Sequence, residues 1–184
     1  MVRAVLIALI LGIASLALAQ TAYAPKPGES VMKIVVEGRG DLYILLHTKK
    51  APKTTAHIVG LVQRGFYNGQ KFHRAIKDPR PFLIQFGDPA TKSKPVDDKT
   101  EWEGGSGARV PFEDSGFGNV AGAVGLATFK DDRDSGDSQF YILLSASRFL
   151  NGSATVFGNV VSGMDVVRKV ARGDKVTSVT ILRG

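Results

Sequence analysis

The stretch that decides the fold reads Lys71-Phe72-His73-Arg74-Ala75-Ile76 and, after a short link, Phe82-Leu83-Ile84-Gln85-Phe86-Gly87-Asp88. Aromatic and aliphatic residues dominate both halves. The first half also carries the long polar side chains of Lys71 and Arg74, and the second carries that of Gln85. Runs of this composition predict strands, one around Phe72 and one over residues 82–86.

Three later segments complete the pattern: Gly136-Asp137-Ser138-Gln139-Phe140-Tyr141-Ile142, Phe149-Leu150-Asn151-Gly152 and Thr155-Val156-Phe157-Gly158. In order and spacing, the whole set resembles the cyclophilin family of peptidyl-prolyl isomerases. The resemblance runs from about Val31 to Ile181. Phe-His-Arg or Ser-Gln-Phe alone would occur by chance in many chains, but the full set in register over residues 71–158 would not.

The composition is that of one globular domain. A chain of 184 residues can bury one full core but is too short for two ordinary domains. With 43% hydrophobic and 22% charged residues, neither a disordered chain nor a polytopic membrane protein is indicated. The 21 glycines against 8 prolines indicate many tight turns, which suit antiparallel β structure better than a helical bundle. There is no cysteine, so disulfides cannot contribute to stability.

The hydrophobic pattern predicts many strands and two short helices. We expect helices over residues 51–65 and 164–170, and strands over 32–37, 42–46, around Phe72, and over 82–86, 123–129, 139–144, 156–161 and 176–182. The segment 101–107, with Trp102 and three glycines, reads as a mobile loop. The cyclophilin resemblance implies a mainly β fold, a closed eight-stranded antiparallel barrel capped by two short helices, and this agrees with the pattern.

The first 24 residues have the pattern of a secretory signal peptide. Met1-Val2-Arg3 is the positive start, residues 4–18 are apolar, and small-x-small sites predict cleavage after Ala19 or Ala24. The alternative is an uncleaved anchor, because the uncharged run could just cross a bilayer of about 30 Å. We expect residues 25–30 to be a leader, 31–184 the isomerase domain, and the protein to be exported to a bacterial periplasm without lasting membrane anchoring.

The net charge of +7 falls to +6 when residues 1–24 are removed, because Arg3 is the only charge among them. The basic residues are dispersed, and no run of five or more like charges marks a nucleic-acid-binding arm. We therefore expect no nucleic-acid partner. The expected partners are proline-containing polypeptides that are unfolded or still folding, and we expect the protein to be a monomer.

The expected reaction asks little of the protein chemically. Rotation about an X-Pro bond faces a barrier of about 18–20 kcal/mol because the amide is conjugated, and no bond is broken. A catalyst therefore needs an apolar pocket for the ring and a donor that favours the twisted amide, and it needs no nucleophile, metal or cofactor. The three histidines have no metal-ligand spacing, and we expect His73 to be a hydrogen-bonded scaffold residue.

The resemblance assigns roles to particular residues. It implies that Arg74 is the catalytic arginine and Gln85 the glutamine that bonds the substrate backbone. It implies a proline pocket lined by Phe82, Leu83, Tyr141 and Leu150, with Phe149 at its edge, and it implies that Phe129 and Lys130 receive the extended peptide. The other aromatic residues, Phe72, Phe140 and Phe157, read as core.

The chain departs from the usual cyclophilin pattern at several of these positions. Phe149 stands where many members have a tryptophan, which implies weak inhibition by cyclosporin because an indole donor is missing. Ala154 stands where many have a pocket-edge histidine, and Tyr141 where phenylalanine is usual, so its hydroxyl must point out of the pocket or find a partner. Residues 77–81 lengthen the link between Arg74 and Phe82 by about three residues, which could displace Arg74.

Two other interpretations stay open beside an exported prolyl isomerase. A non-catalytic proline-peptide-binding or chaperone module could use the same fold, and the longer link at 77–81 favours it, whereas the retained Arg74 and Gln85 favour the enzyme. The second of these interpretations is an envelope interaction protein held in the membrane by its uncleaved N-terminus. N-terminal sequencing of the exported protein would reveal it.

Overall fold

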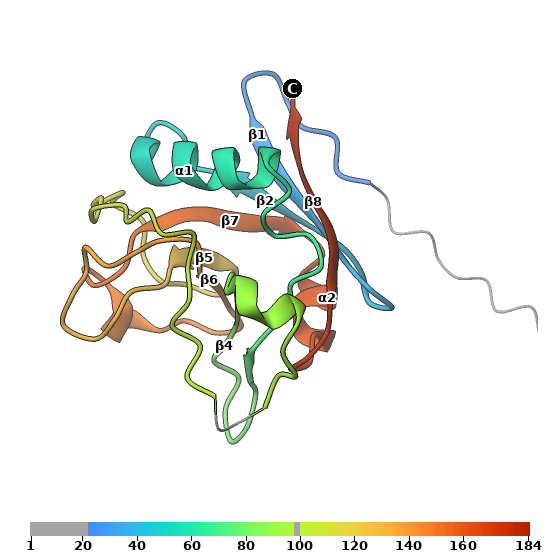
Figure 1. The fold of residues 1–184 in the computed structure, drawn as a ribbon. Helices are drawn as coiled ribbons and strands as arrows, with labels where there is room; N and C mark the ends of the chain where they lie inside the picture. The colour runs from blue at the N-terminus through green and yellow to red at the C-terminus, as the bar shows by residue number, and fades with distance from the viewer. Residues whose placement is uncertain (1–21, 98–99) are drawn as a thin grey trace, which may run out of the picture.

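The computed structural model describes residues 22–97 and 100–184 (Figure 1). The α-helices are α1 (Pro52–Gln63) and α2 (Met164–Lys169), and short 3-10 turns form η1 (Pro89–Lys92) and η2 (Arg148–Leu150). The strands are β1 (Ser30–Val36), β2 (Gly40–Leu46), β3 (Arg74–Ile76), β4 (Leu83–Phe86), β5 (Ala123–Leu126), β6 (Phe140–Leu143), β7 (Val156–Ser162) and β8 (Val176–Arg183).

The strands form one antiparallel sheet in the order β3-β4-β6-β5-β7-β2-β1-β8. The sheet curls around its core, and the two helices lie well apart (Figure 1). Helix α1 packs against β8, and α2 packs against β2. The predicted mainly β fold with eight antiparallel strands and two short helices is thus confirmed.

The eight strands form a curled sheet with two edge strands, β3 and β8. These edges approach each other at a single antiparallel bridge between Lys71 and Lys175, just before each strand begins. Around it, the Gly69 amide donates to the Val176 carbonyl at 2.8 Å and the Phe72 amide to the Asp174 carbonyl at 3.0 Å. A fully closed barrel stays a prediction.

The sheet has apolar clusters on both faces. The larger cluster fills the inside and includes the fully buried Phe72, Phe140 and Phe157, as the sequence predicts for a core. A smaller cluster, built around Leu83 and Tyr141, lies on the other face together with partly buried Phe82 and Leu150. Because side chains alternate along a strand, β4 and β6 contribute to both clusters.

Most predicted element boundaries agree with the structure to within two residues, but two differ. Phe72 lies outside β3, because its backbone bonds to residues 173 and 174 rather than to β4. The strand predicted over 123–129 ends at Leu126, beyond which the chain turns at 129–132. Ser30, predicted as leader, is the first residue of β1.

The predicted signal peptide falls almost entirely on residues 1–21, which lie outside the described residues. Residues 22–29 are described, and there the Tyr23 hydroxyl donates to the Glu29 carboxylate at 2.9 Å. Within 22–97 and 100–184, no helix has the length and apolar character needed to cross a membrane.

Candidate active site

Four residues form a row across neighbouring strands on the outer face of the sheet. Arg74 of β3 pairs in register with Gln85 of β4, Gln85 pairs with Tyr141 of β6, and Tyr141 pairs with Gly125 of β5. Directly opposed residues in an antiparallel sheet project from the same face. The register alone therefore brings together the predicted catalytic pair and one wall of the predicted pocket.

A chain of polar contacts fixes Arg74 and Gln85 in this row. The Arg74 Nη1 donates to Gln85 Oε1 at 2.9 Å, and Gln85 Nε2 donates to Gln139 Oε1 at 2.9 Å. Gln139 Nε2 in turn donates to the carbonyls of Trp102 and Gly104, at 2.8 Å each. Desolvation, followed by repulsion from Arg172, lowers the pKa of Arg74, although an arginine remains protonated at neutral pH.

An apolar hollow of about 280 Å³ lies beside Arg74 and Gln85. Its wall contains every predicted proline-pocket residue, together with Ala154: Phe82, Leu83, Tyr141, Phe149 and Leu150. The rings of Phe82 and Phe149 pack with centroids 5.6 Å apart, and Phe149 remains 75% exposed. Such a hollow has the size and lining for a small apolar ring.

A wider groove of about 680 Å³ adjoins the hollow, and Arg74, Gln85, Ala127 and Thr128 line both. Phe129 and Lys130, predicted to receive the extended peptide, line this groove and are absent from the wall of the smaller hollow. The two catalytic candidates therefore lie where an apolar ring site meets a polar groove.

Comparison with known proteins agrees with this geometry. Residues 31–183 match the family model described as "Cyclophilin type peptidyl-prolyl cis-trans isomerase/CLD". The chain belongs to the cyclophilin family. A "Probable peptidyl-prolyl cis-trans isomerase" of Brucella suis is 38% identical over 164 residues, covering 88% of this chain and 81% of that protein. A human "Peptidyl-prolyl cis-trans isomerase-like 1" is 37% identical over 133 residues, covering 71% and 74%. These relatives identify the chain as a peptidyl-prolyl cis-trans isomerase.

A solved structure of similar fold is a cyclophilin-type isomerase of Cryptosporidium parvum. It has a TM-score of 0.69 and 24% identity, and the match covers 84% of this chain and 99% of that one. At this identity the likeness concerns the fold alone.

The longer link before Phe82 does not separate Arg74 from Gln85 in this cyclophilin. Residues 78–81 are exposed, and the Phe82 amide donates to the Ile76 carbonyl at 3.0 Å across the base of the loop. The β3–β4 register then continues through Ile76–Leu83 to Arg74–Gln85. The extra residues are accommodated outside the sheet.

The hydroxyl of Tyr141 has a buried partner. It donates to Asn119 Oδ1 at 2.6 Å, and burial raises the pKa of this tyrosine well above its ordinary value. Asn119 is held in turn, because its backbone and side-chain amides both donate to Asn151 Oδ1. A Cβ added to Gly125 would collide with the Tyr141 ring and hydroxyl, so the tyrosine requires glycine beneath it.

Tyr141→Phe is expected to lower the free energy of unfolding by about 1–2 kcal/mol, because it leaves the buried Asn119 oxygen without that donor. The ring remains in the hollow, so affinity for an Ala-Pro peptide should change by no more than about twofold. Urea unfolding and NMR titration measure the two effects. Tyr43→Phe is the control, because the bond from the Tyr43 hydroxyl to Asp41 is long, at 3.5 Å. Equal losses of unfolding free energy in the two variants would contradict the role given to the bond between Tyr141 and Asn119.

His73 is buried next to Arg74, as expected of a scaffold residue. Both ring nitrogens lack a partner among the described residues, and the ring stacks on Trp102 with centroids 5.9 Å apart. Burial lowers its pKa from 6.5 to about 4. At neutral pH the ring is therefore uncharged and serves as an apolar surface for Trp102.

Sequence reasoning missed several contributors to the site: Gln139, Asn119, Trp102, Ala127 and Thr128. Gln139 belongs to the segment 136–142 that carries the family resemblance. Its amide side chain comes directly before the strand of Tyr141, so the sequence did contain a signal for this residue. Asn119 and Trp102 come from loops whose partners are far away in the chain. Within the described residues, no group of three potential metal ligands is clustered.

Proposed function

We propose that this isomerase accelerates X-Pro isomerisation while exported proteins fold. In this proposal Arg74 and Gln85 are the catalytic groups, and the proline ring occupies the apolar hollow bounded by Phe82, Leu83, Tyr141, Phe149 and Leu150. The observation that carries it is the position of the Arg74 guanidinium at the edge of the hollow, held at 2.9 Å by Gln85.

The mechanism follows from what changes as the amide twists. Conjugation is lost, and the lone pair localises on the prolyl nitrogen, which becomes a better acceptor than in either planar isomer. A guanidinium fixed beside that nitrogen bonds the twisted state more strongly than the planar states. Each 1.4 kcal/mol or so of such preference gives about tenfold in rate. Gln85 keeps Arg74 from collapsing into the groove.

The groove beside the hollow suits an extended peptide. The Cryptosporidium cyclophilin was crystallised in the presence of the dipeptide Ala-Pro. By analogy, this chain would hold proline in the hollow and the flanking residues in the groove, where Phe129 and Lys130 contact them. Lys130 would favour an acidic residue near the proline. We propose that the protein acts as a monomer, because the hollow and groove are formed within one chain.

Exchange NMR on an Ala-Pro peptide tests the catalytic proposal, using protein that begins at Pro25. We expect faster cis/trans exchange at substoichiometric protein. Chemical-shift changes on binding without faster exchange would instead indicate a non-catalytic proline-binding module.

Export is supported by the signal-peptide pattern of residues 1–24, and we propose the bacterial periplasm as the location. N-terminal sequencing of the protein recovered from a periplasmic extract should begin after Ala19 or Ala24. Recovery in the membrane fraction with Met1 intact would show an uncleaved anchor instead.

Weak inhibition by cyclosporin is expected, because Phe149 offers no indole donor at the rim of the hollow. Phe149→Trp restores a donor at a side chain that is 75% exposed, so packing elsewhere should not change. We expect it to lower the inhibition constant by about tenfold, the worth of one hydrogen bond. Inhibition of Ala-Pro exchange measures this, and Phe149→Leu is the control that should not improve inhibition.

A further inference from the structure

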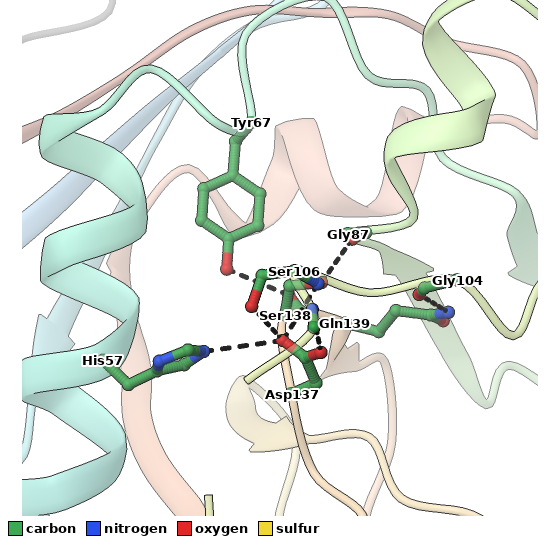
Figure 2. Close-up of polar contacts among 9 residues, drawn as sticks. His57, Tyr67, Gly87, Gly104, Ser106, Asp137, Ser138 and Gln139 are labelled. Carbon is green, nitrogen blue, oxygen red and sulfur yellow. Dashed lines mark hydrogen bonds and ion pairs between the residues drawn. The ribbon is translucent and has the colours of Figure 1, made fainter. Parts of the chain in front are cut away.

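The carboxylate of Asp137 lies beneath the groove and bonds to the loop 104–107. Its Oδ1 accepts from the Ser106 amide at 3.0 Å and from the Ser106 hydroxyl, and its Oδ2 accepts from the Gly107 amide at 2.8 Å (Figure 2). The side chain is only 17% exposed. Hydrogen bonds to an ionised acceptor are about twice as strong as neutral ones. The segment predicted as a mobile loop is therefore tied down.

The loop is shaped for a second carboxylate as well. The Gly104 amide donates to Asp88 Oδ2 at 2.8 Å, and Asp88 is buried. A Cβ on Gly104 would lie 2.6 Å from Asp88 Oδ1, and one on Gly105 would collide with Asp137 Oδ2. The two glycines permit the close approach, so Asp88 and Asp137 together form a carboxylate clamp on this loop.

The clamped loop determines the orientation of Gln139. Its side-chain nitrogen faces the carbonyls of Trp102 and Gly104, each at 2.8 Å, and only the NH2 end of an amide can donate to both. The oxygen end must then point the other way, toward Gln85 Nε2 at 2.9 Å. Gln85 therefore turns its own oxygen toward Arg74.

We propose that Asp137 is a positioning residue for the isomerase reaction. It holds Ser106 and Gly107, next to the Trp102 and Gly104 carbonyls that orient Gln139, and through Gln139 and Gln85 it keeps an acceptor facing Arg74. If the loop moved away, Gln139 would be free to flip and present its NH2 to Gln85; a Gln85 that flipped in response would present NH2 to the guanidinium, which would release Arg74 from its position at the hollow. The proposal rests on the proposed catalytic role of Arg74.

Asp137→Asn tests it, because the variant keeps the size but has a single oxygen for the three loop donors. We expect kcat/KM on an Ala-Pro peptide to fall by about tenfold, mainly through kcat, while peptide affinity changes by no more than about twofold. Asp114→Asn is the matched control: this exposed carboxylate also accepts a loop amide, that of Gly116 at 3.0 Å, but away from the groove. Its kcat/KM should be unchanged.

A double-mutant cycle separates positioning from general support of the fold. In a Gln139→Met background the relay is already broken, so adding Asp137→Asn should lower kcat/KM by no more than about twofold. An unchanged kcat/KM in Asp137→Asn, or an equal fall in both backgrounds, would overturn the proposal. If Asp137→Asn does not fold, Ser106→Ala removes one donor and must show the same non-additivity on a smaller scale.

Failure of the inference can be told apart from failure of the proposed function. If Arg74→Ala retains activity, the catalytic assignment itself is wrong, whatever the cycle gives. If Arg74→Ala loses activity while Asp137→Asn and Gln139→Met act independently, Arg74 is catalytic and Asp137 does not position it.

Discussion

Arg74→Ala should lower kcat/KM for Ala-Pro exchange by about 100-fold or more, the typical cost of removing one transition-state donor. The Arg74 side chain lies at the junction of hollow and groove and donates a hydrogen bond to Gln85 Oε1. Its loss leaves the apolar wall intact, so peptide affinity should change far less than kcat. Exchange NMR gives the rate, and NMR titration gives the affinity.

Arg109→Ala is the matched control for this result. Arg109 lines the same groove and carries the same charge, but it pairs with Asp132 at 3.5 Å on the exposed side. Its removal should change kcat/KM by no more than about twofold. Arg74→Lys tests geometry against charge, because lysine keeps the cation but lacks the planar fork. If Arg74→Ala and Arg109→Ala lower kcat/KM by the same factor, the charge of the groove matters and the position of Arg74 does not.

The part of the site that lies on strands could be predicted from sequence. Arg74, Gln85 and Tyr141 occupy positions of paired strands whose side chains face the same way, so a family motif and the period-two pattern together place them on one surface. The core role predicted for Phe72, Phe140 and Phe157 is confirmed as well, although Phe72 lies outside β3.

The contacts made by loops could not be predicted, because they join residues far apart in sequence. Glu113 caps helix α1 by accepting the amides of Lys53 and Thr54, although α1 begins at a residue with no capping side chain of its own. Asp88 and Asp137 hold the loop 104–107 in the same way. A single aspartate in a polar stretch carries no signal that names its distant partner.

The pairing at the two edges of the sheet could not be predicted from the sequence pattern either. Apolar alternation predicts that β3 and β8 exist, but not how the chain before them pairs. That pairing depends on the backbone around Lys71 and Lys175 and on side chains from elsewhere in the chain, such as Thr91, which accepts the Lys71 amide. Closure of a sheet is set by strand tilt and stagger, which no local pattern encodes.

The stability of the protein should fall as the pH falls from 6.5 toward 4, and His73 should account for much of the loss. Burial lowers the pKa of His73 to about 4; Asp88 opposes this shift, while Arg74 and Arg172 add to it. The unfolded chain binds a proton near pH 6.5, whereas the folded protein does not until about pH 4. Above pH 6.5 this difference in the pKa of His73 contributes its full amount to the free energy of unfolding, about 3 kcal/mol relative to pH 4. The contribution is lost as the pH falls from 6.5 to 4.

Urea unfolding of wild type and His73→Phe at pH 7 and pH 5 measures this effect. Phenylalanine keeps the stack on Trp102 and cannot take up a proton in this pH range. We expect wild type to lose about 2 kcal/mol more than the variant between the two pH values. Burial also lowers the pKa of His47, but this residue is present in both proteins and cancels. Equal losses would show that His73 is protonated as easily in the folded protein as in the unfolded chain.

The neutral state of His73 also bears on catalysis. A charged imidazole behind Arg74 would add a third cation to the pair formed by Arg74 and Arg172, whose mutual repulsion already lowers the pKa of Arg74. It would add repulsion to a guanidinium that is already exposed and is held by its bond to Gln85. A buried ring without hydrogen-bond partners prevents this, because its protonation costs the full desolvation of a charge. Activity of the wild type should therefore persist down to the pH at which the fold itself begins to fail, and the two profiles should fall together.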